Sequence, residues 1–198
     1  IHAAHGYLLH QFLSPLSNLR NDQYGGSLDD RMRFPLEVFE AVSKVWPRQK
    51  AIGVRFSATD WVDRSSWDLK ESTEFAKALK KRGCDFIDVS SGGNSPEQQI
   101  DVGPSYQTAF ASEIKRETGI ATMAVGQITE AFQAEAIIRT GQADMVSMAR
   151  GMLADPRWAW HAAEVLGEQA AYAPQYMRSN KALRGLPIPG NPPVAKKA

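Results

Sequence analysis

The stretch Asp85-Phe86-Ile87-Asp88-Val89-Ser90 leads directly into the polar loop Ser91-Gly92-Gly93-Asn94. A short, largely apolar run that stops at a glycine-bearing loop is typical of a buried β-strand. Runs of the same kind occur at residues 51–56, 120–125 and 143–149. The chain is therefore expected to contain several strands of one sheet that is covered on both faces.

Helical patterns fill the intervals between these strands. Ser66 or Asp68 is expected to cap a helix that ends before Gly83, and Thr129 is expected to cap a later helix. Further helices are expected near residues 27–46, 110–117 and 157–166. Pro35 should kink the first of these helices. Because strands and helices alternate, the sheet should be parallel with right-handed crossovers.

The loops favour a closed barrel over an open doubly wound sheet. No strand is followed by a Gly-x-Gly-x-x-Gly turn, which weakens the case for a dinucleotide-binding fold. Gly126 and Arg150-Gly151 follow the last two strands, and TIM barrels often bind a phosphate after strands seven and eight. Counting back places the segment around His2 at the end of strand four. We therefore predict an α/β fold, a partial TIM (β/α)8 barrel from the end of strand four to strand eight and its helix.

The composition is that of an ordinary soluble globular protein, with 43% hydrophobic and 23% charged residues and a net charge of +1. Basic and acidic residues are interspersed, so no nucleic-acid partner is indicated. No apolar stretch is long enough to span a bilayer, and a cytoplasmic location is expected. The single cysteine, Cys84, excludes a disulfide framework within the chain. Residues 1–178 are expected to form the barrel portion, without its N-terminal strands, and residues 179–198 a Pro/Gly-rich irregular tail.

Three polar side chains lie close together near the start of the sequence: His2, His5 and Tyr7. Hydrogen-bond donors grouped in this way can hold an oxygen atom on which negative charge develops. The alternatives are two structural histidines, a metal-binding pair, and a tyrosine that only packs. No carboxylate or cysteine stands at a supporting spacing, so no metal site is expected. His10 is expected to be a structural or surface histidine.

The first motif resembles the old yellow enzyme family of flavin-dependent ene-reductases. The resemblance begins with His2-Ala3-Ala4-His5-Gly6-Tyr7 and continues through residues 8–15 and 18–27. The later landmarks agree in order: Val54-Arg55, Asp88-Val89-Ser90-Ser91-Gly92, Ala124-Val125-Gly126, Ala149-Arg150 and Asp155-Pro156. The segment Pro174-Gln175-Tyr176-Met177-Arg178 is similar to the C-terminal arginine segment of the bacterial, thermophilic-like branch. The similarity covers residues 1 to about 178.

The resemblance implies a TIM barrel that binds FMN and is reduced by NADPH or NADH. It further implies hydride transfer to the β-carbon of a small α,β-unsaturated substrate such as an enone. In this comparison His2 and His5 match the pair that hydrogen-bonds the substrate carbonyl oxygen. Tyr7 matches the tyrosine that protonates the α-carbon, a role open to a phenol because it keeps its proton at neutral pH.

The resemblance also implies a set of cofactor-binding residues: Arg55, Ser90, Gly126, Ala149 and Arg150. Arg55 matches the arginine beside flavin N1 and the C2 carbonyl, although a surface ion pair is the alternative. Ser90 matches a position near the flavin. Gly126, Ala149 and Arg150 match the phosphate-binding positions. Many relatives have Gly where Ala149 stands, but an alanine still offers its backbone N–H to a phosphate.

Arg178 matches an arginine that reaches into the active site of a neighbouring subunit, which implies a homo-oligomer. A solvated arginine in the tail is the alternative. A different function also stays open: an inactive or incomplete piece, or binding domain, of a larger flavoprotein similar to dienoyl-CoA reductase or trimethylamine dehydrogenase. Those proteins carry an iron–sulfur cluster, and the presence of one cysteine argues against a cluster here.

Overall fold

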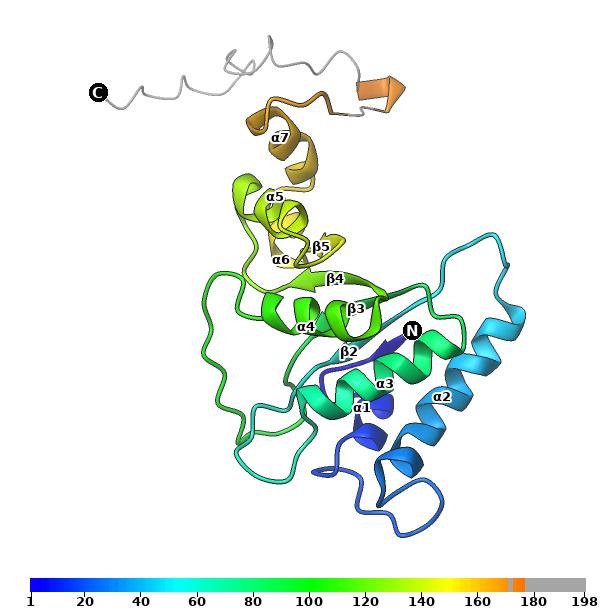
Figure 1. The fold of residues 1–198 in the computed structure, drawn as a ribbon. Coiled ribbons are helices and arrows are strands. Elements are labelled where there is room, and N and C mark those ends of the chain that lie inside the picture. Colours follow the sequence, from blue (N-terminus) through cyan, green and yellow to red (C-terminus); the bar gives the residue numbers. More distant parts are fainter. Residues whose placement is uncertain (171–172, 177–198) are drawn as a thin grey trace. The chain divides into compact units, whose positions relative to one another are not determined.

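The computed structural model describes residues 1–170 and 173–176. The internal contacts divide the chain into two units, Ile1–Pro156 and Arg157–Ala198. The first unit contains the sheet and the helices α1–α6, and the described part of the second contains α7 and a short 3-10 helix (Figure 1). Arg178 and the tail at 179–198 lie outside the described residues.

Strands and helices alternate along most of the described chain, as the sequence suggests. They are β1 (His2–Ala3), α1 (Leu8–Leu13), α2 (Leu28–Val45), β2 (Gly53–Ser57), α3 (Leu69–Lys81), β3 (Phe86–Ser90), α4 (Thr108–Thr118), β4 (Ala121–Val125), α5 (Ala131–Arg139), β5 (Met145–Ser147), α6 (Arg150–Ala154), α7 (Trp158–Val165) and the 3-10 helix η1 (Pro174–Tyr176).

The five strands form one parallel sheet in the order β1-β2-β3-β4-β5. Each strand therefore pairs with the next one along the chain. This order is that of a singly wound barrel, because an open doubly wound sheet reverses its strand order at a switch point. The predicted fold class, a partial TIM barrel, is confirmed. His2 pairs with Arg55, so β1 lies beside β2, at the position that the sequence count gave to strand four.

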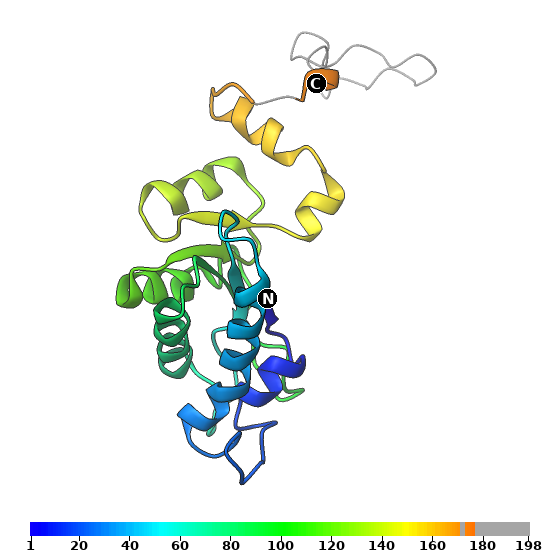
Figure 2. The same ribbon diagram turned by 90° about the vertical axis from the view of Figure 1, so that its right-hand side faces the viewer.

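Side chains alternate between the two faces of the sheet. Val54 and Phe56 of β2 are buried, and the ring of Phe56 lies 5.7 Å from that of Phe75 in α3. Arg55 lies between them in sequence and points to the opposite face, where Asp88 of β3 pairs with it in register. Figures 1 and 2 both show α3 and α4 on the same side of the sheet. The apolar core thus fills the helix-covered face, and the other face carries charged residues.

Most predicted boundaries lie close to the observed ones, and a cap explains the start of α3. Asp68, rather than Ser66, caps α3, because its carboxylate accepts the backbone N–H of Glu71 at 2.8 Å. Pro35 lies inside α2, which runs through it without a break.

The local structure differs from the sequence-based expectations in three places. The N-cap of α5 is Glu130 and not Thr129. The side chain of Gln133, in the first turn of the helix, accepts the backbone N–H groups of Thr129 and Glu130. The strand expected at 143–149 is only Met145–Ser147, because the chain turns at Ala149 into α6. The short helices α1 and α6 were not expected.

Among the described helices, none combines the length and the apolar character needed to cross a membrane.

Candidate active site

A cavity of about 490 Å³ lies at the carboxyl ends of β2, β3, β4 and β5. This is the end of a parallel barrel at which active sites are built. Six of the residues singled out in the sequence line it: His5, Arg55, Ser90, Gly126, Ala149 and Arg150. The strands therefore bring together residues that are far apart in the sequence, and the predicted cofactor residues share one pocket.

A tight turn after β1 carries His5 into this pocket. His5 and Gly6 both have positive φ angles, 58° and 74°. The backbone N–H of His5 donates to Ser57 Oγ at 3.1 Å, and Ser57 Oγ donates to the carbonyl of Gly92 at 2.9 Å. A side chain on Gly93 would lie 2.6 Å from the Cα of His5. The turn after β1 and the loop after β3 are thus in direct backbone contact.

The His5 ring is held as a neutral imidazole. Its Nε2 lies 2.6 Å from Ser90 Oγ. Burial, followed by the nearby positive charge of Arg55, lowers the pKa of His5 to about 4. Burial and the Arg55 charge also lower the pKa of His2. Near pH 7 His5 can therefore offer a neutral N–H or a lone pair, whereas a charged imidazolium would be unfavourable beside the guanidinium.

His2 and Tyr7 lie beside His5 but do not line the cavity. The ring of His2 is 5.5 Å from that of His5 and 5.4 Å from that of Tyr7, measured between centroids. Tyr7 is 64% exposed. The three predicted catalytic side chains therefore form one cluster at the edge of the pocket, with His5 as its innermost member.

Arg55 reaches across to the neighbouring strand. Its Nη1 donates to Asp88 Oδ2 at 3.1 Å, and its Nη2 lies 3.5 Å from Ser90 Oγ. Burial raises the pKa of Asp88, although the charge of Arg55 partly opposes that rise. Within the described residues the buried Nε of Arg55 has no hydrogen-bond partner. An unpaired buried guanidinium N–H on a pocket wall is suited to an acceptor atom of a ligand.

Gly126 forms the turn at the end of β4, with a φ of 121°. A Cβ at this position would lie 2.8 Å from both Gln107 Nε2 and the ring of Tyr106. Gln107 donates to the carbonyl of Val125 at 3.1 Å and so holds the turn in place. Only glycine fits here, which leaves the backbone of the turn open to the pocket.

The end of β5 supplies the remaining two predicted positions. Ala149 has a φ of −99°, an angle that an alanine adopts without strain, so the absence of glycine at this position has no cost in backbone strain. Arg150 is exposed, begins α6 and brings a positive charge to the same cavity. The two positions together offer a backbone N–H and a guanidinium.

These donors fit FMN on chemical grounds. The β2 side of the pocket offers the unpaired N–H of Arg55 to a ring that accepts hydrogen bonds. The β4 and β5 side offers a glycine turn and the Arg150 guanidinium, a combination suited to a phosphate. Within the described residues, no three His, Cys, Asp or Glu side chains gather as they would around a metal ion.

The sequence did not single out several residues that shape the pocket: Ser57, Ser91, Tyr106 and Gln107. Ser91 Oγ accepts the indole N–H of Trp61 at 2.7 Å and donates to Gln107. Ser57 and Ser91 follow the ends of predicted strands, so the rule that sites lie at carboxyl ends could have drawn attention to them. Gln107 stands in the long loop after β3, where no local pattern marks it.

A singly wound parallel barrel with a donor-rich pocket at the strand ends is the architecture of TIM-barrel enzymes that hold a phosphate-bearing cofactor. The family model described as NADH:flavin oxidoreductase / NADH oxidase matches residues 1–169, and the chain belongs to this family. The predicted resemblance to old yellow enzymes is confirmed. The family implies FMN as the cofactor and a nicotinamide as the reductant.

Individual relatives agree with this assignment. The chain is 48% identical over 178 residues to an NADPH dehydrogenase of Geobacillus sp. (strain WCH70), covering 90% of this chain and 51% of the relative. It thus spans about half the length of that relative. Among solved structures, morphinone reductase superposes with a TM-score of 0.65 at 27% identity, covering 88% of this chain and 45% of that one. A complex of 2-naphthoyl-CoA reductase gives 0.74 at 25% identity, covering 84% and 26%.

Proposed function

We propose that the protein reduces the activated C=C bond of a small α,β-unsaturated carbonyl compound with electrons from NADPH or NADH. The observation that carries this proposal is the cluster of His2, His5 and Tyr7 beside a pocket that also holds Arg55. When bound, FMN supplies the redox chemistry by taking a hydride from the nicotinamide and passing it to the alkene.

In this proposal His2 and His5 donate hydrogen bonds to the carbonyl oxygen of the substrate. Negative charge grows on that oxygen when hydride reaches the β-carbon, so donors aimed at it stabilise the transition state more than the ground state. The lowered pKa values of both histidines support neutral donors, which need not lose a charge during the reaction. The distance of 5.5 Å between the two rings is compatible with two donors that converge on one oxygen atom.

Tyr7 is proposed to give a proton to the α-carbon. Its ring lies next to that of His2, and its exposure leaves the phenol free to approach a substrate at the pocket edge. A tyrosine that only closes the pocket would contact a ligand without transferring a proton.

On the cofactor side, Arg55 and Ser90 would contact the flavin ring, and Gly126, Ala149 and Arg150 would contact the phosphate. The unpaired Nε of Arg55 and the open glycine turn support these roles. A fixed cation beside the ring favours the negative charge that the reduced ring carries.

A homo-oligomer in which Arg178 enters the neighbouring site, and a cytoplasmic location, remain proposals. The alternative of a larger flavoprotein of the dienoyl-CoA reductase or trimethylamine dehydrogenase type is not favoured. The identity of 48% to an NADPH dehydrogenase exceeds the 25% to 2-naphthoyl-CoA reductase, of which this chain covers only 26%.

Stopped-flow measurement of the two half-reactions in the intact, FMN-loaded protein tests the proposal. His2→Ala and His5→Ala should slow alkene reduction by about 100-fold or more, because each removes one donor to the developing oxyanion. Reduction of the flavin by NADPH should change much less. Lys77→Ala, an exposed position on α3, serves as the control and should leave both rates unchanged. Equal losses in both half-reactions would reject the assignment of the two histidines.

A further inference from the structure

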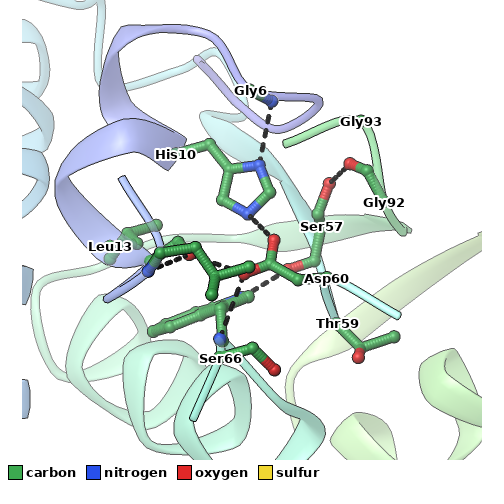
Figure 3. A network of polar contacts seen from close by, with 12 residues as sticks. Gly6, His10, Leu13, Ser57, Thr59, Asp60, Ser66, Gly92 and Gly93 are labelled. Atoms are coloured by element: carbon green, nitrogen blue, oxygen red, sulfur yellow. Dashed lines mark hydrogen bonds and ion pairs between the residues drawn. The ribbon is translucent and has the colours of Figure 1, made fainter. Parts of the chain in front are cut away.

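His10 and Asp60 form a buried pair directly behind the turn that carries His5. Both side chains are fully buried, and His10 Nε2 lies 3.1 Å from Asp60 Oδ1. His10 belongs to α1, and Asp60 belongs to the loop after β2. Figure 3 shows the His10 ring between the backbone of Gly6 and the carboxylate of Asp60. The proposed chemistry makes no use of this pair.

The contacts of His10 fix which ring nitrogen carries the proton. The backbone N–H of Gly6 donates to His10 Nδ1 at 3.0 Å, so Nδ1 must present a lone pair. The proton of the neutral ring is then on Nε2, which faces Asp60. The carboxylate of Asp60 therefore selects the tautomer that can accept the Gly6 N–H.

Asp60 is held as a carboxylate by its other partners. Burial by itself would raise the pKa of Asp60, but the adjacent His10 ring and hydrogen bonds from Ser14 and the backbone of Trp67 lower it overall. Its Oδ2 accepts the hydroxyl of Ser14 at 2.5 Å and the backbone N–H of Trp67 at 3.1 Å. Because both donors use Oδ2, Oδ1 remains for His10.

These contacts close a ring of polar interactions around His5. The indole N–H of Trp67 donates to the carbonyl of Ser57 at 2.6 Å. Ser57 Oγ in turn accepts the backbone N–H of His5 at 3.1 Å. The ring thus runs from His5 through Ser57, Trp67, Asp60 and His10 to Gly6, the residue next to His5. Figure 3 labels four of its members, Ser57, Asp60, His10 and Gly6. It holds the two positive-φ residues from both sides.

We propose that His10 and Asp60 are positioning residues: Asp60 fixes the His10 tautomer, and His10 anchors the Gly6 amide so that His5 points at the substrate oxygen. This inference rests on the proposed role of His5. Neither residue needs to touch the substrate, because a small displacement of a positioned donor is enough to weaken its contact with the ligand.

Asp60→Asn is the sharpest test, because it preserves size and shape. With the amide oxygen retained by Ser14 and Trp67, the amide NH2 faces His10 Nε2, and the His10 proton must move to Nδ1. Nδ1 can then no longer accept the Gly6 N–H. Long-range ¹H–¹⁵N NMR spectra of the histidine rings in the intact, FMN-loaded protein report the tautomer directly. Asp144→Asn, at the opposite end of the strands, is the matched control, since Asp144 also accepts a backbone N–H.

The expected result is a proton on Nε2 of His10 in the wild type and on Nδ1 in Asp60→Asn. The Kd for 4-hydroxybenzaldehyde, whose phenolate oxygen resembles an enolate oxygen, should rise by about 10-fold or more in the variant by calorimetry. Flavin reduction by NADPH and the Asp144→Asn control should be unchanged. A wild-type proton on Nδ1, or a shifted tautomer with unchanged phenol affinity, would overturn the proposal.

If Asp60→Asn does not fold, the pair His10→Asn and His10→Leu decides the question. The asparagine retains an acceptor near the Gly6 N–H and should bind the phenol better than the leucine; equal affinities would count against the proposal. The two inferences can also fail separately. If His2→Ala and His5→Ala leave phenol affinity intact, the proposed function fails. If they weaken it and Asp60→Asn does not, only the positioning role fails.

Discussion

Gly6 and Gly26 have similar backbone angles but different surroundings. Their φ angles are 74° and 81°, both in the region that side chains disfavour. A Cβ on Gly6 would lie 2.4 Å from the carbonyl oxygen of Gly93, whereas a Cβ on Gly26 would meet nothing within 4 Å. Comparing the two glycines therefore distinguishes the effect of backbone strain, which both share, from the effect of a close contact between two loops, which only Gly6 has.

Gly6→Ala should destabilise the intact protein by about 1–3 kcal/mol more than Gly26→Ala. Both variants bear the strain of a left-handed alanine, about 1–2 kcal/mol, but only the first forces the β3 loop to move. Urea unfolding curves of the two variants measure the difference. Equal losses of stability would mean that the contact with Gly93 contributes nothing.

His5 should make stability depend on pH in a narrow window. Its pKa is about 4 in the folded protein and near 6.5 in an unfolded chain, so between these values the unfolded state binds more protons. Stability should therefore fall as the pH is lowered from about 6.5 towards 4. Unfolding measured at several pH values should show a shallower slope in His5→Gln. An identical slope in the variant would contradict the lowered pKa.

The sequence predicted the chemistry-bearing residues better than their supports. His2, His5, Arg55 and Gly126 stand in motifs or at strand ends, and the structure brings them to one region. Their roles stay predictions. Asp60 and His10 could not be paired from the sequence, because their contact depends on how α1 packs against a loop that is distant in the chain.

At the scale of elements, Arg31 joins three helices. Its side chain is 5% exposed, and it donates to Glu71 of α3 and to the carbonyl of Leu13 at the end of α1. Arg31 itself lies in α2. The guanidinium thus satisfies an otherwise unpaired carbonyl at a helix end as well as a carboxylate.

Arg31→Leu should cost about 3 kcal/mol of stability, because it leaves Glu71 and the Leu13 carbonyl without their donor. Lys77→Ala breaks an exposed pair with Glu74 on α3 and should cost far less stability, because solvent screens exposed ion pairs. Thermal unfolding of both variants gives the comparison. A small effect of Arg31→Leu would show that water replaces the guanidinium at this site.

Helices and strands were predicted correctly where the segment was long enough to show a clear hydrophobic pattern. The strands at β2, β3 and β4 and the helix α3 lie within a few residues of the expected ranges. The short helices α1 and α6 escaped notice because five or six residues show barely more than one helical turn of pattern. Their formation depends on the loops into which they pack.

At the scale of the molecule, the strand order distinguishes a barrel from an open doubly wound sheet, which hydrophobic periodicity in the sequence cannot do. A sheet ordered β1-β2-β3-β4-β5 has β1 and β5 at its edges among the described residues. The unpaired backbone groups of such edges seek partners. The match to the NADPH dehydrogenase covers 51% of that relative.

The 198 residues by themselves should therefore bind FMN weakly. The described pocket is lined by the ends of β2 to β5 and by the loops that follow the strands, and a ligand held on one side loses much of the burial that small-molecule sites provide. Absorbance of the purified 198-residue chain near the flavin bands, with a size measurement, tests this. A monomer that keeps flavin absorbance would contradict the expectation. The intact protein, which should keep its flavin, is the control.

The hydroxyl of Ser57 links the backbone of His5 to that of Gly92, and this link matters for protein engineering. Replacing the loop after β3 with one from another barrel would remove the backbone surface that the turn carrying His5 contacts. Chimeras of that kind should lose turnover even when every reacting group is preserved. Libraries that aim at new substrates would therefore do better to vary both segments jointly, with Ser57 left untouched.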